Sequence, residues 1–245
     1  MSELIEAQQK IGNSQAVSHN EATASVVTVS NETTGAVAPC FYSWQGLYPE
    51  LQILLDNIEI IKEEVDAVKG TFVPWPEDHF TLGDDVENSK EWNVYPLLHT
   101  FPAYDPDCKK WIPATCEKCP RTTALLKQLQ PLIRTALFSR LGPGTKLSSH
   151  TGWADLANYV LRCHLCLDIP TDGTCGLLVD GQIGYHRKNH IVVFDDSKPH
   201  RAFNNSMSCD RTVLIIDMWR PIDIPKGTAT GSHTPELDGF VARFK

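Results

Sequence analysis

Two well-separated histidines, His150 and His200, have the residue type and the setting that metal chemistry needs. His150 follows a Gly-Pro-Gly turn and a short strand, and His200 follows an aspartate-rich turn. Imidazole suits Fe(II), and non-haem oxygenases leave coordination positions open for oxygen and a cosubstrate. The usual third ligand is missing, because Gly152 stands two residues after His150 and the nearest acid is Asp155. The pair predicts an iron site with an incomplete ligand set; a packed or capped histidine is the ordinary alternative for each.

Two arginines occupy positions where the fold could hold an anion. On an expected strand over 158–169, alternation places Arg162, His164 and Cys166 on one side and apolar residues on the other. The apolar side must pack, so Arg162 and His164 are predicted to face the interior. Arg211 precedes an aliphatic strand and poses the same question. A buried guanidinium is costly unless an anion meets it, which predicts a small anionic ligand. The open alternatives are a structural ion pair with Asp195, Asp196 or Asp217, and exposure of Arg211 at a strand end.

Two cysteine pairs, Cys116-x-x-Cys119 and Cys163-x-x-Cys166, match the spacing of a zinc ribbon. The second pair lies within the expected strand, where positions three apart face opposite sides. This favours reduced thiols over structural zinc, and a redox disulfide between Cys116 and Cys119 is the remaining alternative. Phosphate-loop, Rossmann and α/β-hydrolase classes lack their signatures in this sequence.

The composition is that of an ordinary folded protein. The chain has 245 residues, 42% apolar and 21% charged, which suits one domain or one domain with a helical extension. A net charge of -8 disfavours nucleic acid as the main partner. The sequence lacks a long apolar run and a secretory signal at its start. We therefore expect a cytoplasmic protein without a membrane span, whose eight cysteines are reduced.

The first half of the chain predicts a tail, helices and loops. Residues 1–38 are rich in small polar residues and are expected to form a flexible tail. The apolar spacing from Leu51 predicts one amphipathic helix that stops near Gly70. Residues 71–120 hold many aromatics and prolines without a period, which predicts irregular loops beside a substrate cleft. A second helix is expected near Pro120, with Thr122 or Thr123 as its cap and Leu125, Leu126, Leu129 and Leu132 as its buried stripe.

Strand patterns dominate after residue 135. Apolar or alternating runs occur at 135–141, 158–169, 175–179, 190–194 and 211–219, and Asp180-Gly181 predicts a two-residue hairpin. Short antiparallel strands at this spacing predict a mainly β protein with flanking helices, built as a jelly roll. The predicted parts are a helical and loop region over 39–134 packed on the barrel, a catalytic core over 135–221 and a C-terminal extension over 222–245.

These elements resemble, in order, the catalytic domain of the aspartyl/asparaginyl β-hydroxylase family. The resemblance covers residues 120–221, with a weaker echo over 44–68. It is carried by Phe138-Ser139, Pro143-Gly144-Thr145, His150-x-Gly152, Asn158-x-x-Leu161-Arg162-x-His164-Leu165, Phe194-Asp195-Asp196-Ser197-x-x-His200, and Arg211-x-x-Leu214-x-x-Asp217-x-Trp219-x-Pro221.

The resemblance implies a double-stranded β-helix and an enzyme that uses Fe(II), 2-oxoglutarate as cosubstrate and O2 to hydroxylate an unactivated C–H bond. His150 and His200 match the metal-binding histidines of the family. Ser139, Arg162, His164 and Arg211 match the positions that bind the carboxylates of 2-oxoglutarate. The family lacks the third, carboxylate ligand, so Gly152 fits it.

The resemblance also implies a substrate class, the β-carbon of an aspartyl, asparaginyl or related amino-acid-derived compound. Three departures widen the choice: the spacing from His150 to Arg162 is about three residues longer than in the family, Val160 stands where vertebrate members carry a basic residue, and no anchor or lumenal signal is seen. A small molecule, a peptide or an acyl chain fits as well. The remaining alternatives are a halogenase, since Gly152 could leave room for chloride, and a non-enzymatic cupin-like binding module.

Overall fold

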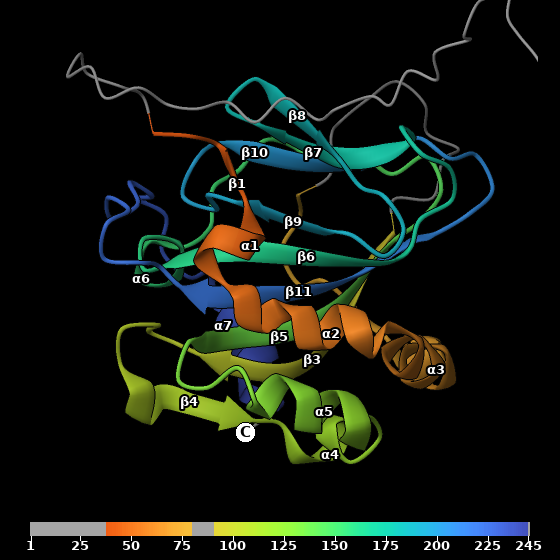
Figure 1. Ribbon diagram of the computed structural model, residues 1–245, viewed down its shortest axis with the longest axis horizontal. Coiled ribbons are helices and arrows are strands. Elements are labelled where there is room, and N and C mark those ends of the chain that lie inside the picture. Colours follow the sequence, from red (N-terminus) through yellow and green to blue (C-terminus); the bar gives the residue numbers. More distant parts are fainter. Residues whose placement is uncertain (1–37, 80–90, 245) are drawn as a thin grey trace, which may run out of the picture. The chain divides into compact units, whose positions relative to one another are not determined.

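Two antiparallel sheets make up the body of the protein, which is a computed structural model that describes residues 38–79 and 91–244 (Figure 1). The larger sheet has the order β1-β9-β6-β11-β5-β3-β2, with β4 paired to β3, and the smaller sheet has the order β10-β7-β8. This confirms the expected fold, a double-stranded β-helix with flanking helices. The predicted tail lies outside the described residues, apart from residue 38. The strands are β1 (Phe41–Tyr42), β2 (Val73–Pro74), β3 (Trp92–Thr100), β4 (Lys109–Trp111), β5 (Ile133–Leu141), β6 (Val160–Asp168), β7 (Cys175–Val179), β8 (Gln182–Tyr185), β9 (Ile191–Phe194), β10 (His200–Asn204) and β11 (Arg211–Trp219).

The two faces of the larger sheet pack against different parts of the protein. On β11, Leu214, Ile216 and Met218 join the main apolar core with α2, α3 and α5, while Val213 and Ile215 belong to a separate cluster on the other face. Because side chains alternate along a strand, Arg211 shares the side of Val213 and faces away from these helices. The helices are α1 (Trp44–Leu47), α2 (Gln52–Asp56), α3 (Ile58–Val68), α4 (Pro113–Cys116), α5 (Pro120–Lys127), α6 (Ala154–Ala157) and α7 (Pro235–Ala242), with 3-10 turns at Pro49–Leu51, Lys69–Thr71 and Pro106–Cys108.

The region expected to be irregular contains a nine-residue strand, β3. It pairs with β5 from Trp92 opposite Leu141 to Leu98 opposite Ala136, so the larger sheet extends beyond the predicted core boundary. The sequence shows no alternation of apolar and polar residues here, because β3 is buried on both faces: Tyr95 packs toward the helices, while Val94 lines an internal pocket. A register shift between Pro96 and Leu98 also disturbs the alternation.

The first predicted helix is broken in two at Asn57. The backbone of Asn57 leaves the helical region, with φ -117° and ψ 22°, and its side-chain amide donates a hydrogen bond of 2.8 Å to the carbonyl of Ile53. Asparagine competes with the helix for backbone partners in this way. As a result α3 turns away from α2 and is seen nearly end-on in Figure 1. No helix within 38–79 and 91–244 has the length and apolar character that a membrane crossing needs.

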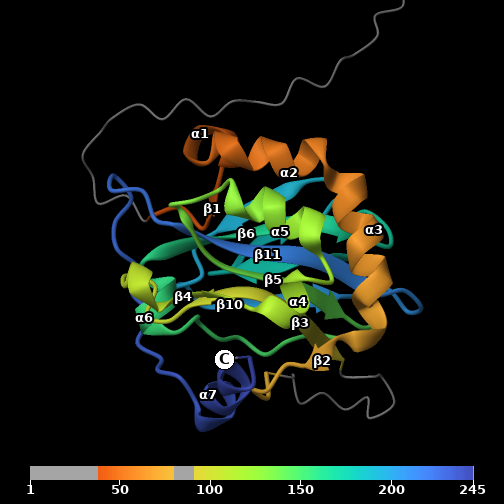
Figure 2. The ribbon, with the colours of Figure 1, turned by 90° about the horizontal axis from the view of Figure 1, so that it is seen from below.

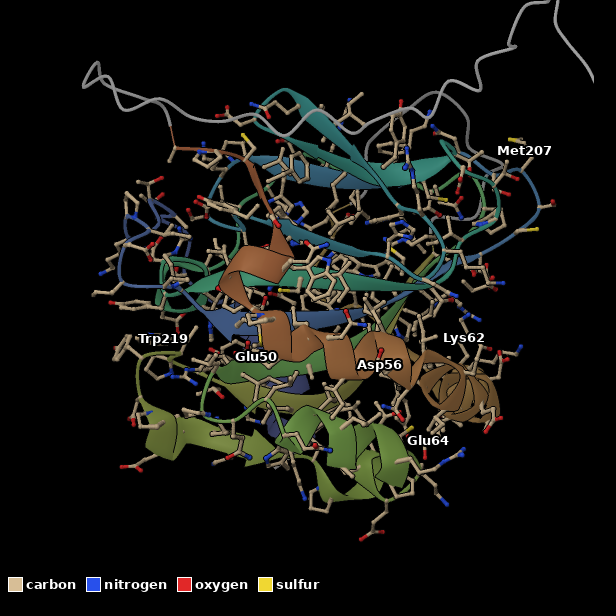
Figure 3. All side chains as sticks on the ribbon, in the orientation of Figure 1. Glu50, Asp56, Lys62, Glu64, Met207 and Trp219 are labelled. Carbon is tan, nitrogen blue, oxygen red and sulfur yellow. The ribbon has the colours of Figure 1, made fainter. Side chains whose placement is uncertain are left out.

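The second helix, α5, is confirmed, but neither predicted threonine is its cap. The cap position is Cys119, which makes no side-chain capping bond, and Pro120 takes the first helical position. The carboxylate of Glu64 on α3 accepts hydrogen bonds from the backbone N–H groups of Arg121 and Thr122, at 2.9 and 2.8 Å. Figure 3 shows Glu64 on α3 close to α5. A tertiary contact therefore replaces the local cap.

Replacing Glu64 with alanine is expected to lower the free energy of unfolding at pH 7 by about 1–3 kcal/mol, because two helical N–H groups lose a buried, charged acceptor. Burial alone would raise the pKa of Glu64, but the hydrogen bonds from Thr122 and Arg121 lower it below 4.5. Its contribution is therefore present above pH 4.5 and is lost as the pH falls through the lowered pKa. Urea unfolding at pH 7 and pH 3 checks both points. Glu63→Ala is the control, since its ion pair with Arg121 is exposed and should contribute little.

The two cysteine pairs do not form a zinc ribbon. Cys163 packs in the main core under the helices, while Cys166 belongs to the cluster on the opposite face of β6. Cys116 and Cys119 are both unpaired thiols, as are the other cysteines. The opposite facing of Cys163 and Cys166 follows from the strand alternation used in the prediction.

Candidate active site

The fold brings His150 and His200 side by side. The two residues form an antiparallel bridge in which each backbone N–H donates to the other carbonyl, at 2.9 and 2.8 Å. Their ring centroids lie 4.5 Å apart, with an interplanar angle of 58°. Residues 50 positions apart in the sequence thus present two imidazoles to one spot between the sheets.

Both rings are held in the tautomer that a metal requires. Nδ1 of His150 donates to the carbonyl of Ser148, and Nδ1 of His200 donates to the carbonyl of Lys198, each at 2.9 Å. A carbonyl oxygen only accepts, so Nδ1 carries the proton and Nε2 keeps its lone pair. Burial lowers the pKa of His150 to about 3 and that of His200 to about 4. Neutral imidazoles with a bare Nε2 are suited to hold Fe(II).

A carboxylate that the sequence analysis placed only as a possible ion-pair partner lies beside this pair. Asp196 is fully buried, and its Oδ1 is 3.4 Å from Nε2 of His200 and 2.6 Å from Nη1 of Arg162. Its Oδ2 has no hydrogen-bond partner among the described residues. Burial raises the pKa of Asp196, and the Arg162 guanidinium opposes the rise. The other candidate acid, Asp155, lies 3.2 Å from His233 instead.

Gly152 makes room for this carboxylate. A Cβ built on Gly152 would lie 2.0 Å from Oδ2 of Asp196 and 2.8 Å from Cβ of Ala157. The space that a side chain at position 152 would fill is therefore occupied by Asp196. Asp196, which comes from another part of the chain, therefore supplies a carboxylate at the place where the sequence lacks one two residues after His150.

Gly152→Ala is expected to displace Asp196 from His200 and Arg162 and to lower metal affinity or turnover by about 10- to 100-fold, the range expected when a group beside the metal ligands is lost. The measurement is Fe(II) affinity followed by 2-oxoglutarate turnover. Gly46→Ala is the matched control, because a Cβ there meets nothing within 4 Å. Equal Fe(II) affinity and equal turnover in the Gly152→Ala and Gly46→Ala variants would contradict the role given to Asp196.

Arg162 faces the interior as predicted, but the expectation that it lacks a buried acid is wrong. Its Nε lies 2.8 Å from Oδ1 of Asp217, and its Nη1 lies 2.6 Å from Oδ1 of Asp196. Register explains the first contact, because Arg162 on β6 is directly opposite Asp217 on β11. The structural ion pair left open by the sequence is thus formed, and contact of Arg162 with a cosubstrate stays a prediction.

Arg211, in contrast, makes no ion pair with an acid among the described residues. It is 1% exposed, and its Nε and Nη1 have no hydrogen-bond partner there. Burial lowers the pKa of Arg211 to about 10. Nε2 of His164 is also buried without a partner in the described chain. Ser139 is 1% exposed, and its Oγ accepts a hydrogen bond from Nε1 of Trp92, which leaves its own proton to donate.

The histidine pair, His164 and Arg211 follow one another along the larger sheet. Arg211 and Asp217 stand at opposite ends of β11, about 20 Å apart for six residues of strand. Nearer the middle, Ile215 pairs with His164. The ring of Phe194 contacts both His164 and His200, at 5.2 Å between centroids. His164 therefore lies between the histidine pair and Arg211, as a group bridging a metal and a remote cation would.

A pocket with aromatic walls opens beside His150 and Gly152. Trp75 stacks on Trp92 and Trp153, with centroids 4.7 and 5.9 Å away. His79, which the sequence analysis did not select, stacks on His150 at 4.4 Å. The C-terminal extension supplies one wall through α7, which lies on the side of the sheet away from α1 and α2 (Figure 2). Leu237, Phe240 and Val241 of α7, together with Phe244 just after the helix, line the pocket.

The jelly roll thus gathers two metal-competent imidazoles beside a buried arginine. Residues 55–221 match the family described as aspartyl/asparaginyl beta-hydroxylase, and the chain belongs to that family. The resemblance inferred from the motifs is thereby confirmed.

Two curated relatives and one solved structure illustrate the likeness. Aspartate beta-hydroxylase domain-containing protein 2 of Xenopus tropicalis is 38% identical over 70% of this chain and 45% of its own length. Ornithine lipid ester-linked acyl 2-hydroxylase of Rhizobium tropici is 34% identical over 73% of this chain and 56% of its own length. The chain thus spans about half of each. A Pseudomonas putida prolyl-4-hydroxylase structure aligns with 68% of this chain and 88% of its own, at a TM-score of 0.44 and 17% identity.

Proposed function

We propose that the protein is an Fe(II)- and 2-oxoglutarate-dependent dioxygenase that hydroxylates an unactivated C–H bond. The observation that carries the proposal is the alignment of two neutral imidazoles with His164 Nε2 and the Arg211 guanidinium, both buried and without a partner or an acid within residues 38–79 and 91–244. A dicarboxylate that reaches from the metal to Arg211 would satisfy all of these groups.

Each residue then has a definite task. Nε2 of His150 and of His200 would hold the metal, and Asp196, whose Oδ1 lies on the Nε2 side of His200, would lie next to the metal and remain paired with Arg162. Arg211 would bind one carboxylate of 2-oxoglutarate bidentately, with Ser139 and His164 donating to its oxygens. When bound, Fe(II) with 2-oxoglutarate and O2 supplies the oxidant and leaves succinate. The aromatic walls of the pocket would exclude water from the reacting C–H bond.

Anaerobic titration tests the cofactor assignment. Fe(II) and 2-oxoglutarate should bind together with 1:1 stoichiometry, and succinate should form only when both and O2 are present. A protein that binds neither Fe(II) nor 2-oxoglutarate would be a cupin-like binding module and not a dioxygenase. The halogenase alternative is disfavoured because Asp196 fills the space beside Gly152 and carries the same charge sign as chloride. Product mass with and without chloride decides that point.

The pocket favours an apolar substrate over an aspartyl or asparaginyl one. Among the described lining residues Arg162 is the one guanidinium and no lysine occurs, and Arg162 is already engaged by Asp196 and Asp217. Glu77 accepts hydrogen bonds from Trp153 and Thr234. A substrate carboxylate would therefore find no free cation in this part of the pocket, whereas Trp75, Trp92 and Phe240 suit an acyl or aromatic group. The Rhizobium relative is named for acyl hydroxylation, which accords with this choice.

A succinate-release screen against amino acids, dipeptides and acyl compounds distinguishes the substrate classes. Acyl or other apolar compounds should stimulate succinate formation, and Phe240→Ala should shift the preference toward bulkier compounds because Phe240 forms part of the wall. Stimulation by aspartyl peptides alone would overturn the substrate proposal and leave the cofactor assignment intact.

A further inference from the structure

A second buried histidine, His186, lies behind His164 and was not singled out by the sequence. It follows β8 directly, its side chain is 0% exposed, and its backbone N–H donates to the carbonyl of Cys175 at 2.9 Å. Its Nε2 is 3.2 Å from Nδ1 of His164. The contact joins the smaller sheet to β6 of the larger one, because His186 is fixed to β7 and His164 lies on β6.

The two imidazoles share a single proton across this contact. Burial and the nearby Arg211 charge lower the pKa of His186 well below its ordinary range, and burial together with His186 does the same for His164. Both rings are therefore neutral, and each carries one N–H. Either His186 Nε2 donates to His164 Nδ1, or His164 Nδ1 donates to His186 Nε2.

We infer that His186 is a positioning residue that donates to Nδ1 of His164 and thereby keeps the proton on Nε2 of His164. The inference rests on the proposed function, in which Nε2 of His164 faces a carboxylate oxygen of 2-oxoglutarate. A carboxylate only accepts, so it requires N–H at that position. In the reverse arrangement a lone pair of His164 would face the carboxylate, and the hydrogen bond would be lost.

Two substitutions of similar length separate this role from packing. The amide of His186→Gln can still donate to Nδ1 of His164, whereas the thioether of His186→Met has no donor. We expect the Met variant to raise the KM for 2-oxoglutarate about tenfold or more, as loss of a hydrogen bond to a charged group does, with little change in kcat at saturation. The Gln variant should stay within about threefold of the wild type. His190→Gln, an exposed histidine nearby in the sequence, is the control.

Each outcome either supports or overturns the role inferred for His186. Equal KM values for the Gln and Met variants, whether both normal or both raised, overturn the inference. A wild-type protein that fails to bind 2-oxoglutarate defeats the proposed function itself. Should the Met variant not fold, 15N NMR of histidine-labelled wild type with Zn(II) and 2-oxoglutarate replaces it. A protonated Nε2 and a bare Nδ1 on His164 support the inference, and the opposite pattern contradicts it.

Discussion

His200→Ala abolishes 2-oxoglutarate turnover to succinate and prevents stable Fe(II) binding: this is the expected result with the largest effect. His200 supplies one of the two imidazoles assigned to the metal, and its Nδ1 bond to Lys198 aims a bare Nε2 at the same spot as that of His150. With one ligand removed, His150 alone cannot keep the metal. Equilibrium Fe(II) binding and succinate release at saturating 2-oxoglutarate measure the loss.

The same measurements on His150→Ala should give the same result, since both rings are held in the same tautomer with Nε2 free for the metal. His190→Ala provides the control, because His190 is exposed and away from the pair. Thermal unfolding should remain cooperative in all three. A His200→Ala protein that still converts 2-oxoglutarate would refute the ligand assignment.

Arg211→Met is expected to weaken 2-oxoglutarate binding by about 100-fold or more while stabilising the ligand-free protein. Loss of a buried, hydrogen-bonded charge pair costs on the order of 2–5 kcal/mol of binding. Without the ligand, however, the Arg211 charge is buried and meets no acid in the described part of the chain, which destabilises the fold. Titration calorimetry with 2-oxoglutarate and urea unfolding without it measure the two opposite effects.

The pH dependence has a definite sign. Burial lowers the folded-state pKa of Arg211 to about 10, so below that pH the guanidinium is charged and the folded protein carries the cost of burying this charge. The free energy of unfolding of the wild type should therefore increase as the pH rises above 10 and Arg211 loses its proton. The Arg211→Met variant should lack this increase. Arg211→Lys keeps the charge but not the planar fork, so it should bind 2-oxoglutarate weakly. A Met variant that is less stable and binds normally would show a purely structural role.

Strand alternation was sufficient to predict much of the candidate site. The facing of Arg162 and His164 followed from a period of two, because the opposite side of β6 had to pack against the helices. The hairpin at Asp180-Gly181 was equally local: both residues have positive φ, 46° and 81°, as a two-residue turn requires. Such features depend on neighbours in the sequence, which is why the sequence reveals them.

Contacts between distant elements escaped prediction. The role of Asp196 depends on its approach to Gly152, the cap of α5 comes from Glu64, and the pocket wall comes from Phe240 on α7. None of these pairs is related by a helical or strand period. His186 has no local signature either, because its partner His164 lies on the other sheet.

By itself the sequence determined the family and the strand-rich fold, and it singled out His150 and His200 as candidate metal ligands, because residue type and alternation are properties of the chain. The tertiary structure alone decided which buried charge is satisfied. Arg162 meets Asp217 because β6 and β11 pair in one register, and Arg211, at the far end of β11, meets no acid among the residues that the structure describes. Electrostatic compensation depends on distances across the sheet, and only the folded packing sets those distances.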